Sequence, residues 1–454
     1  MAEVNTIHCG KPLSIGTEFC VYSSFLRLSA INILSNLMVP LAGIIDVAFL
    51  GHLSDIRHLA GVSLATVIFN YIYWSFGFLR MGTTGTVAQA VGRQDDIDLW
   101  RIGIRNSVIA VCLGIAILFL QHPLRELGFF LLSAEPSVEE AGRAFFNARI
   151  WGAPAVLVNF VLLGWFLGRS HASTVLVLSI IGNGANVVLD YWMIVRLGWD
   201  STGAGLATAL SQYAMLLVGI GFIIRERPNR HLANIQWTTE MFAWNKLRQV
   251  FALNVDILIR TLALVSAFSV FTNLSAALGT TMLAVNTLML QVVTLAAYFI
   301  DGLAFATESF AGMIYGKGDR LQLIPLLKLA SGLSIATGLM FAGVVVIRPT
   351  FLFGLLTIHT EVITAAHDVV GWLIPVLGFG AIAFILDGYF IGLTQGRILR
   401  NASILAALCG FVPMAIVAWW QRDQQLLWLA MTLFMISRGI ALGVKVPDTL
   451  RSPT

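Results

Sequence analysis

Long apolar segments alternate with short polar ones along almost the whole chain. About twelve of these segments have the ~18 residues or more that a helix needs to cross a hydrocarbon core of about 30 Å. No alternating strand pattern of about ten residues recurs, as a transmembrane barrel would require. The pattern therefore predicts an all-α integral membrane protein. Its predicted spans are centred near Leu37, Trp74, Val111, Val158, Val187, Leu216, Val265, Ala297, Leu339, Ile382, Cys409 and Leu433.

Composition and charge agree with this fold class. Of the 454 residues, 57% are hydrophobic and 11% are charged, whereas about a quarter of the residues in soluble domains are charged. The basic residues lie in short loops between apolar segments, which the positive-inside rule explains without a nucleic-acid partner. Roughly 17 Lys and Arg fall on the side of both termini and about 6 on the other, so we expect both termini to be cytoplasmic. No cleavage site for a signal peptide is recognisable.

The chain divides into two similar halves. The stretch that begins at Leu59 aligns without a gap on the stretch that begins at Leu283, and each ends in Gly, a cation and Asp. Parallel repeats of this kind are typical of transporters in which two bundles rock about a central cavity. The expected organisation is a tail (1–20), a six-helix lobe (21–225), a cytoplasmic linker (226–247), a second six-helix lobe (248–445) and a C-terminal tail (446–454).

Several motifs resemble one transporter family along nearly the full length. They include "VPLAGIIDVAFLGHL", "FLRMGTTGTVAQAVGRQD", "GNGANVVLDYWMIVRLGWDSTGAGLATAL", "YFIDGLAFATESFAGMIYGKGD" and "DGYFIGLTQGR". The chain resembles a multidrug and toxic compound extrusion (MATE) transporter of the DinF-type branch. The resemblance implies twelve helices in two lobes that form a V around a central cleft. It also implies antiport of drugs and toxic organic compounds against protons or sodium, and hence a role in antibiotic resistance.

One acid interrupts the first apolar segment. Asp46 follows Pro40 by under two helical turns, and a proline inside a helix removes a backbone hydrogen bond and can kink it. A carboxylate in the middle of a membrane helix costs a few kcal/mol, which makes it a candidate functional group. We expect Asp46 to bind the coupling proton, and it also matches the essential first-helix acid of the family. The competing interpretation is a structural acid satisfied by neighbouring hydroxyls or amides.

A second acid, Asp190, is preceded by two asparagines on the same face of its predicted helix; we call the two asparagines the amide stripe. Asn183 and Asn186 precede Asp190 by seven and four residues, so all three share one helical face. Such a stripe suits a hydrogen-bonded proton site or a cation site made of oxygens. Polar groups of this kind also hold membrane helices together, which is the alternative. The resemblance assigns Thr208 to the same network, although threonine often bonds its own helix backbone.

The second half lacks this pair, since the repeat places Val270 and Met414 at the equivalent positions. It carries other charges, which form either a second cation or substrate site or a structural ion-pair network, because buried charges are usually paired. These are Asp256, Arg260, Asp301, Glu308 and Asp387. Arg80, at the cytoplasmic end of the second span, is interpreted as a snorkelling or helix-end residue and not as a ligand contact.

Other classes of function fit the sequence less well. The chain has no nucleotide-binding loop and no helical metalloprotease motif, so we expect neither ATP hydrolysis nor catalysis, and no metal or cofactor. Proton coupling is favoured because Arg260 beside Asp256 disfavours sodium there, while sodium coupling and a lipid-linked precursor flippase remain alternatives. We expect a monomer in a bacterial inner membrane, with lipophilic or cationic cargo attracted to carboxylates and aromatic rings. The cavity-side candidates are Tyr71, Trp74, Phe76, Met81 and Tyr298.

Overall fold

The computed structural model describes residues 15–53, 55–132, 135–226, 243–357 and 359–451. No strand occurs in these ranges, and twelve helical segments are long and apolar enough to cross a membrane. Each of the twelve predicted centres lies in one of these segments, which confirms the predicted fold class. Residues 227–242, most of the predicted linker, lie outside the described residues, as does most of the predicted N-terminal tail.

The first six spans form the N lobe. Three of them are interrupted: the second span turns between Ser75 and Phe78, the fourth has a 3-10 turn at Ile150–Gly152, and the fifth ends in a π-helix at Tyr191–Arg196. The helices are α1 (Ile15–Gly51), α2 (Ile56–Ser75), α3 (Phe78–Gly92), α4 (Asp96–Phe119), α5 (Gln121–Leu131), α6 (Pro136–Arg149), α7 (Ala153–Gly168), α8 (Ala172–Asp190) and α9 (Asp200–Arg225).

The other six spans form the C lobe, in which α10 and α11 are the two longest helices. The helices are α10 (Trp244–Ala277), α11 (Thr280–Lys317), α12 (Leu323–Ile347), α13 (Pro349–Gly354), α14 (Thr360–His367), α15 (Leu373–Gly392), α16 (Gly396–Leu405), α17 (Val412–Gln421), α18 (Gln424–Gly443) and α19 (Val446–Leu450). A π-helix at Ala406–Phe411 joins α16 to α17.

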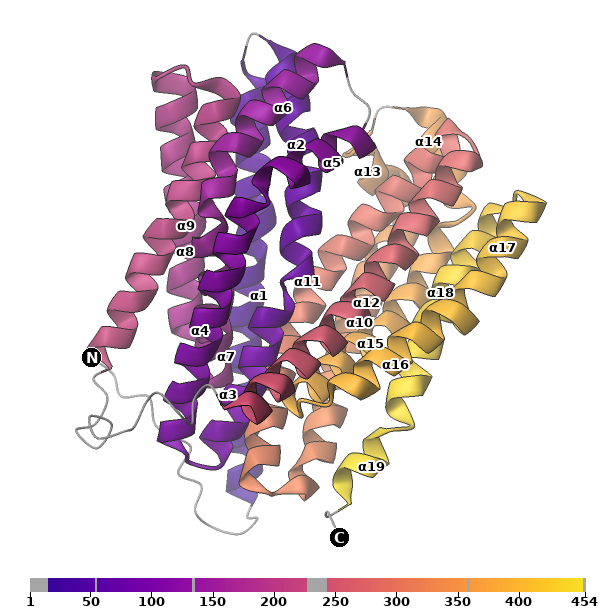
Figure 1. The fold of residues 1–454 in the computed structure, drawn as a ribbon. Helices are drawn as coiled ribbons and strands as arrows, with labels where there is room; N and C mark the ends of the chain where they lie inside the picture. Colours follow the sequence, from indigo (N-terminus) through magenta and orange to yellow (C-terminus); the bar gives the residue numbers. More distant parts are fainter. Residues whose placement is uncertain (1–14, 54, 133–134, 227–242, 358, 452–454) are drawn as a thin grey trace.

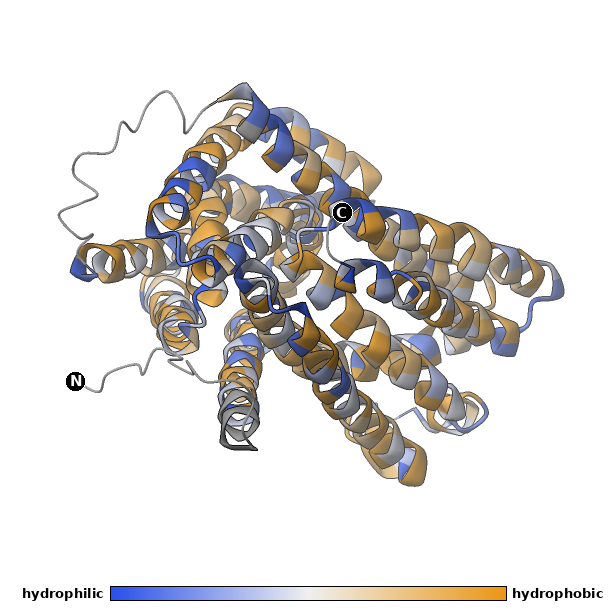
Figure 2. Cartoon of the chain, turned by 90° about the horizontal axis from the view of Figure 1, so that it is seen from below, coloured by the Kyte–Doolittle hydropathy of each residue, from blue (hydrophilic) through white to orange (hydrophobic). Residues whose placement is uncertain are grey.

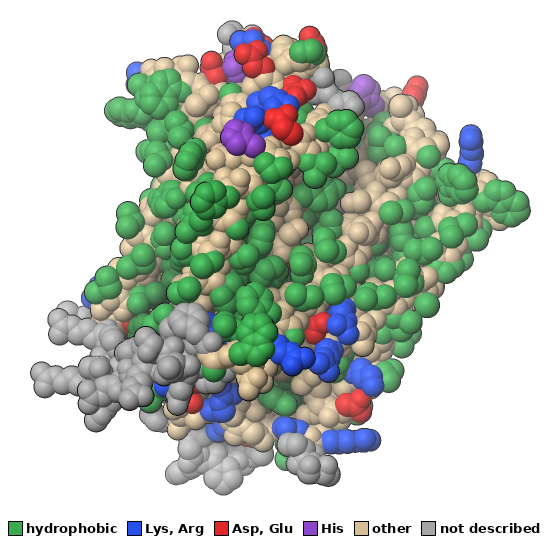
Figure 3. All heavy atoms as spheres, viewed as in Figure 1, with side chains coloured by type: hydrophobic (Ala, Val, Ile, Leu, Met, Phe, Trp, Pro, Cys, Tyr) green, Lys and Arg blue, Asp and Glu red, His purple; other side chains and the backbone are tan. Residues whose placement is uncertain are grey.

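The two lobes approach each other at the end that carries α19 and diverge toward the end that carries α5 and α14 (Figure 1). On the face shown in Figure 3, a broad hydrophobic band crosses the middle of the molecule, and charged side chains gather at its two ends. Viewed from the α19 end, hydrophobic residues also line much of the outside of the helices (Figure 2). This distribution is what a bilayer requires of a helical protein, because the lipid core solvates no charges.

The lobes meet along a seam formed by α3, α11 and α15, which we call the lobe seam. A Cβ atom on Gly92 would overlap the carbonyl oxygen of Met313, and one on Gly316 would overlap that of Gln89. A Cβ atom on Gly85 would likewise overlap the carbonyl oxygen of Ile391. Small residues let membrane helices approach backbone to backbone. Gly92 and Gly316 occupy equivalent positions in the two repeats, so the seam is built from both copies of one motif.

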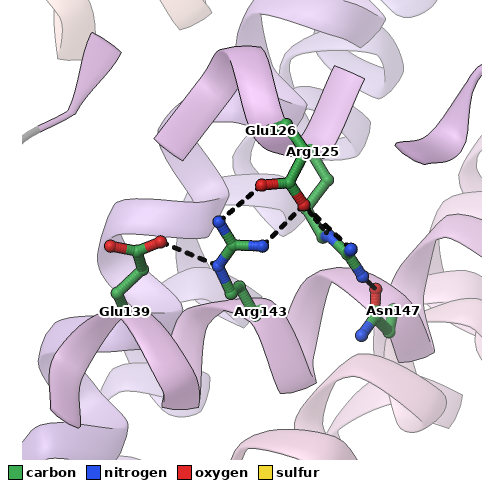
Figure 4. Close-up of polar contacts among 5 residues, drawn as sticks. All are labelled: Arg125, Glu126, Glu139, Arg143 and Asn147. Carbon is green, nitrogen blue, oxygen red and sulfur yellow. Dashed lines mark hydrogen bonds and ion pairs between the residues drawn. The ribbon is translucent and has the colours of Figure 1, made fainter. Parts of the chain in front are cut away.

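At the opposite end, α5 is held against α6 by a network of charges (Figure 4). Arg143 on α6 donates to both carboxylate oxygens of Glu126 on α5, at 2.6 and 2.8 Å, and to Glu139 at 2.7 Å. Arg125 donates to the same Glu126 and, at 2.8 Å, to Asn147. The neighbouring Phe130 is 83% exposed. A short amphipathic helix with exposed apolar side chains is suited to lie in the membrane interface.

Candidate functional site

The two acids of the N lobe lie together. The carboxyl groups of Asp46 on α1 and Asp190 at the end of α8 are within hydrogen-bonding reach of each other. Asp190 is 1% exposed, and the Oδ1 atom of each acid has no hydrogen-bond partner among the described residues. Ionised carboxylates are acceptors only, so two of them can hydrogen-bond to each other only when one carries a proton. The pair is therefore chemically able to hold one shared proton.

Asn186 is the amide that reaches this pair. Its Nδ2 donates to Oδ2 of Asp190 at 2.8 Å from one turn earlier in α8. The other two predicted polar residues bond their own helices instead: Asn183 donates to the carbonyl of Ser179 at 2.8 Å, and Thr208 to that of Ala204 at 2.9 Å. The structure thus brings together Asp46, Asp190 and Asn186, and places Asn183 and Thr208 in backbone hydrogen bonds.

A cation that sequence reasoning missed lies beside the acids. The guanidinium of Arg149, the last residue of α6, interacts electrostatically with both Asp46 and Asp190. It also lies 4.6 Å from the ring centroid of Phe69, and its Nε is buried without a hydrogen-bond partner in the described residues. Two ionised acids and one arginine carry a net charge of −1, and one added proton makes the group neutral. Protonation therefore changes the charge of this group between −1 and zero.

Pro40 lies inside α1, between the part of the helix that contacts the C lobe and the part that carries Asp46. Before the proline, Asn36 donates to the carbonyl of Tyr298 on α11 at 3.3 Å, and Ile33 packs against Gly302. After it, the helix exposes large apolar side chains, with Ile44 65% exposed. Because proline removes one helical hydrogen bond, bending at this position would move the Asp46 half relative to the anchored half.

The C-lobe charges form a buried cluster around Asp387 on α15. Its Oδ2 accepts hydrogen bonds from Arg260 on α10 and Arg438 on α18, and Arg438 is completely buried. Arg438 is a second group that sequence reasoning missed. Glu308 on α11 pairs with Arg80 on α3 at 3.8 Å.

The prediction that Arg80 snorkels to the interface is wrong. Its side chain is 13% exposed and its guanidinium stacks 3.9 Å above the ring centroid of Phe305 on α11. The reason is that α3 packs into the lobe seam, so this face of the second span contacts α11 instead of lipid.

The charges of this cluster balance. Three guanidinium groups (Arg80, Arg260 and Arg438) interact with three carboxyl groups (Asp301, Glu308 and Asp387). The three positive and three negative charges cancel in sum, although two of the arginines share Asp387, so the cluster offers no net negative charge to a bound cation. Asp256 lies apart from it and pairs with Arg400 on α16 at 2.7 Å, although Arg260 is only one turn away on the same helix.

Comparisons with known proteins agree with this architecture. The MatE family model matches residues 32–192 and 257–417, once in each lobe. DNA damage-inducible protein F of Escherichia coli (strain K12) is 34% identical over 445 residues, 94% of this chain and 96% of that protein. The probable multidrug resistance protein NorM of Acinetobacter baylyi is 27% identical over 311 residues, 66% of either chain.

The fold is shared with solved transporters. A MOP superfamily transporter from Pyrococcus furiosus superposes with a TM-score of 0.84 at 18% identity and covers 97% of this chain and 100% of that one. The family model matches both repeats, and the Escherichia coli relative is similar along nearly its full length. Both findings agree with the family motifs that occur in the two lobes. The chain therefore belongs to the MatE family of membrane transporters, in its DinF-type branch.

Proposed function

We propose that the protein is a secondary antiporter that exports lipophilic or cationic organic compounds in exchange for protons. The observation that carries the proposal is the Asp46–Asp190 pair, two carboxyl groups within hydrogen-bonding reach beside Arg149. A proton bound there removes the negative charge that attracts a cationic cargo, so that proton and cargo compete for one group. A ligand shifts a conformational equilibrium only through such differential binding.

The cycle follows from this competition. Protonation from the outside neutralises the pair, changes the bend of α1 near Pro40 and releases the cargo. The protonated molecule then rocks so that the lobes open to the cytoplasm, where the higher pH removes the proton and restores affinity. The proposal also places the protein in a bacterial inner membrane, as a monomer with both termini in the cytoplasm. The multidrug resistance named for the Acinetobacter baylyi relative supports drugs and toxic compounds as cargo.

Aromatic side chains in the middle of the second span suit flat, lipophilic cargo. Tyr71 and Trp74 on α2 are 54% and 58% exposed, and the hydroxyl of Tyr71 lies 3.4 Å from that of Ser269 on α10, in the other lobe. Cations bind over aromatic faces, and flat molecules stack on them. The C-lobe cluster is assigned a structural role in this proposal because its charges balance.

Sodium coupling is the second candidate, because Asp46, Asp190 and Asn186 supply several oxygens that a cation could use in place of a proton. One experiment separates the two. Purified protein in weak buffer is titrated with a fluorescent lipophilic cation such as ethidium, proton release and dye binding are recorded, and sodium is then varied.

We expect the dye to release protons from the unmodified protein and Asp46→Asn to abolish the release while the protein stays folded. Asp96→Asn, which removes an exposed acid at the start of α4, is the matched control and should release protons normally. If Asp46→Asn releases protons like the unmodified protein, the proposed site is wrong. If sodium alone displaces the dye, the coupling ion is sodium.

A further inference from the structure

A polar cavity lies between the lobes at the α19 end, away from both acid clusters. Its volume is about 570 Å³. Its walls come from α3 and α4 in the N lobe and from α10 and the start of α16 in the C lobe, so both lobes are needed to form it. The residues that define it are Gln89, Arg93, Arg105, Asp256, Gln395 and Arg397.

Arg105 is the unusual member of this wall. It is 6% exposed, its Nε is buried without a partner, and no described residue forms a hydrogen bond or ion pair with it. Asp98 attracts it electrostatically, but that carboxylate already pairs with Arg93 at 3.0 Å. Burying a guanidinium without a partner is costly, so this position calls for an anion.

The sum of the charged side chains in and beside the cavity indicates how much negative charge such an anion would carry. Arg397 projects from the start of α16 and has no ion pair with any residue in the described ranges, whereas Asp256 is neutralised by Arg400. Counting Arg93, Arg105, Arg397 and Arg400 against Asp98 and Asp256 leaves two positive charges in excess. A phosphate monoester carries about −1.5 to −2 near pH 7 and offers three acceptor oxygens to guanidinium groups, as free phosphate does, and so it can compensate both charges. The phosphodiester headgroup of an acidic phospholipid carries a single negative charge and compensates one of them.

The position of Arg397 is set by close packing. A Cβ on Gly396 would lie 2.9 Å from the Cβ of Asp256, so the first turn of α16 lies directly on α10. The preceding turn is held by Gln89 of the N lobe, which donates to the carbonyl of Gly392 at 3.0 Å and to Thr394 at 3.1 Å. Arg105 and Arg397 therefore line the same cavity from opposite lobes.

We propose that this cavity binds a phosphate-bearing anion between Arg105 of the N lobe and Arg397 of the C lobe. The anion is either a free phosphate or the headgroup of an acidic phospholipid, and by bridging the lobes it stabilises the state in which they touch at this end. The site is independent of the proposed transport function, since none of its residues belongs to the Asp46–Asp190 pair.

The test uses the full chain in a non-ionic detergent. Inorganic phosphate, dihexanoyl phosphatidylglycerol and dihexanoyl phosphatidylcholine are each titrated by calorimetry into the unmodified protein and into Arg105→Gln, Arg397→Gln and Arg225→Gln. Arg225 is the matched control, an exposed arginine at the end of α9 that does not line the cavity. We expect saturable binding that Arg105→Gln weakens at least tenfold, Arg397→Gln weakens several-fold and Arg225→Gln leaves unchanged.

The probes identify the source of the anion. Saturation by inorganic phosphate supports a free phosphate, and saturation by phosphatidylglycerol alone supports a lipid headgroup. Saturation by none of them, equal binding of phosphatidylcholine, or unchanged binding by Arg105→Gln overturns the proposal. Thermal unfolding without anion is a second readout: Arg105→Gln should unfold at the same or a higher temperature, because it removes an uncompensated buried charge, whereas a lower midpoint contradicts that view of Arg105.

Discussion

At the scale of single residues, hydrogen-bond partners separate the predicted polar residues of the N lobe. Asn186 donates to Asp190, whereas Asn183 and Thr208 donate to carbonyls of their own helices. A hydrogen bond to a charged group contributes about 1.5–3 kcal/mol, which corresponds to roughly a tenfold or larger change in an equilibrium constant. We therefore predict that Asn186→Ala lowers the apparent affinity for cargo, measured from cargo-triggered proton release, at least tenfold.

Asn183→Ala and Thr208→Ala are the matched controls for this prediction and should stay within about twofold of the unmodified protein. The measurement is dye-triggered proton release across a range of dye concentrations. A loss in Asn183→Ala as large as that in Asn186→Ala would contradict it. That result would show that the whole amide stripe acts, as the helical spacing alone predicts.

At this scale the sequence predicts which acids matter better than it predicts which arginines lie beside them. The cost of burying a carboxylate in a membrane marks Asp46 and Asp190 without any knowledge of packing. The same cost applies to Arg438 in "MISRGIALG", so the signal for this residue is present in the sequence. Its pairing with Asp387, however, depends on how α18 lies against α15, which hydropathy does not encode. Arg149 lies at a helix end, where arginines are common and carry no such signal.

At the scale of elements, the network between α5 and α6 depends on one carboxylate. Hydrogen bonds from Arg143 and Arg125 lower the pKa of Glu126 to about 2. The stabilisation that the ionised Glu126 gives to the folded state is therefore complete above its usual pKa of about 4.5 and is lost only as the pH falls toward 2. We predict that Glu126→Gln loosens α5, because Glu139 is then the one ionised partner that Arg143 keeps among the described residues.

Hydrogen exchange of α5 amides measures this loosening. Exchange should accelerate in Glu126→Gln and be unchanged in Glu140→Gln, which removes an exposed acid of α6 that is outside the network. In the unmodified protein, the protection of α5, corrected for intrinsic exchange rates, should be equal at pH 7 and pH 5. Equal exchange in the two variants at pH 7 would mean that packing, and not the charges, holds α5.

Element-scale prediction succeeded where hydropathy decides and failed where local backbone geometry decides. All twelve span centres follow from the length of apolar segments, since a bilayer requires each one to be helical. The turn after Ser75 and the π-helix at Tyr191–Arg196 leave the hydropathy unchanged, so nothing in the apolar pattern reveals them. The π-helix follows Asp190 directly, and such local distortions are frequent at functional sites.

At the scale of the whole molecule, the lobe seam determines how closely the two halves approach. The repeat was visible in the sequence, but the contact of its two copies was not, because an alignment does not say which faces meet. Gly316 packs against the carbonyl oxygen of Gln89 without room for a methyl group. Overpacking of this kind costs about 1–3 kcal/mol. We predict that Gly316→Ala separates the lobes at the α19 end and lowers the free energy of unfolding by that amount.

Electron spin resonance can measure this separation between labels at Gln94 and Leu321, two exposed positions on opposite sides of the seam, after the four native cysteines are replaced by serine. The mean distance should increase or broaden in Gly316→Ala. Gly343→Ala in α12 is the matched control, since nothing lies within 4 Å of a Cβ there, and it should leave the distance unchanged and gain up to about 1 kcal/mol of helix propensity. An unchanged distance in Gly316→Ala would mean that the strain is absorbed within α11, and that the backbone contacts of the seam do not set the spacing of the lobes.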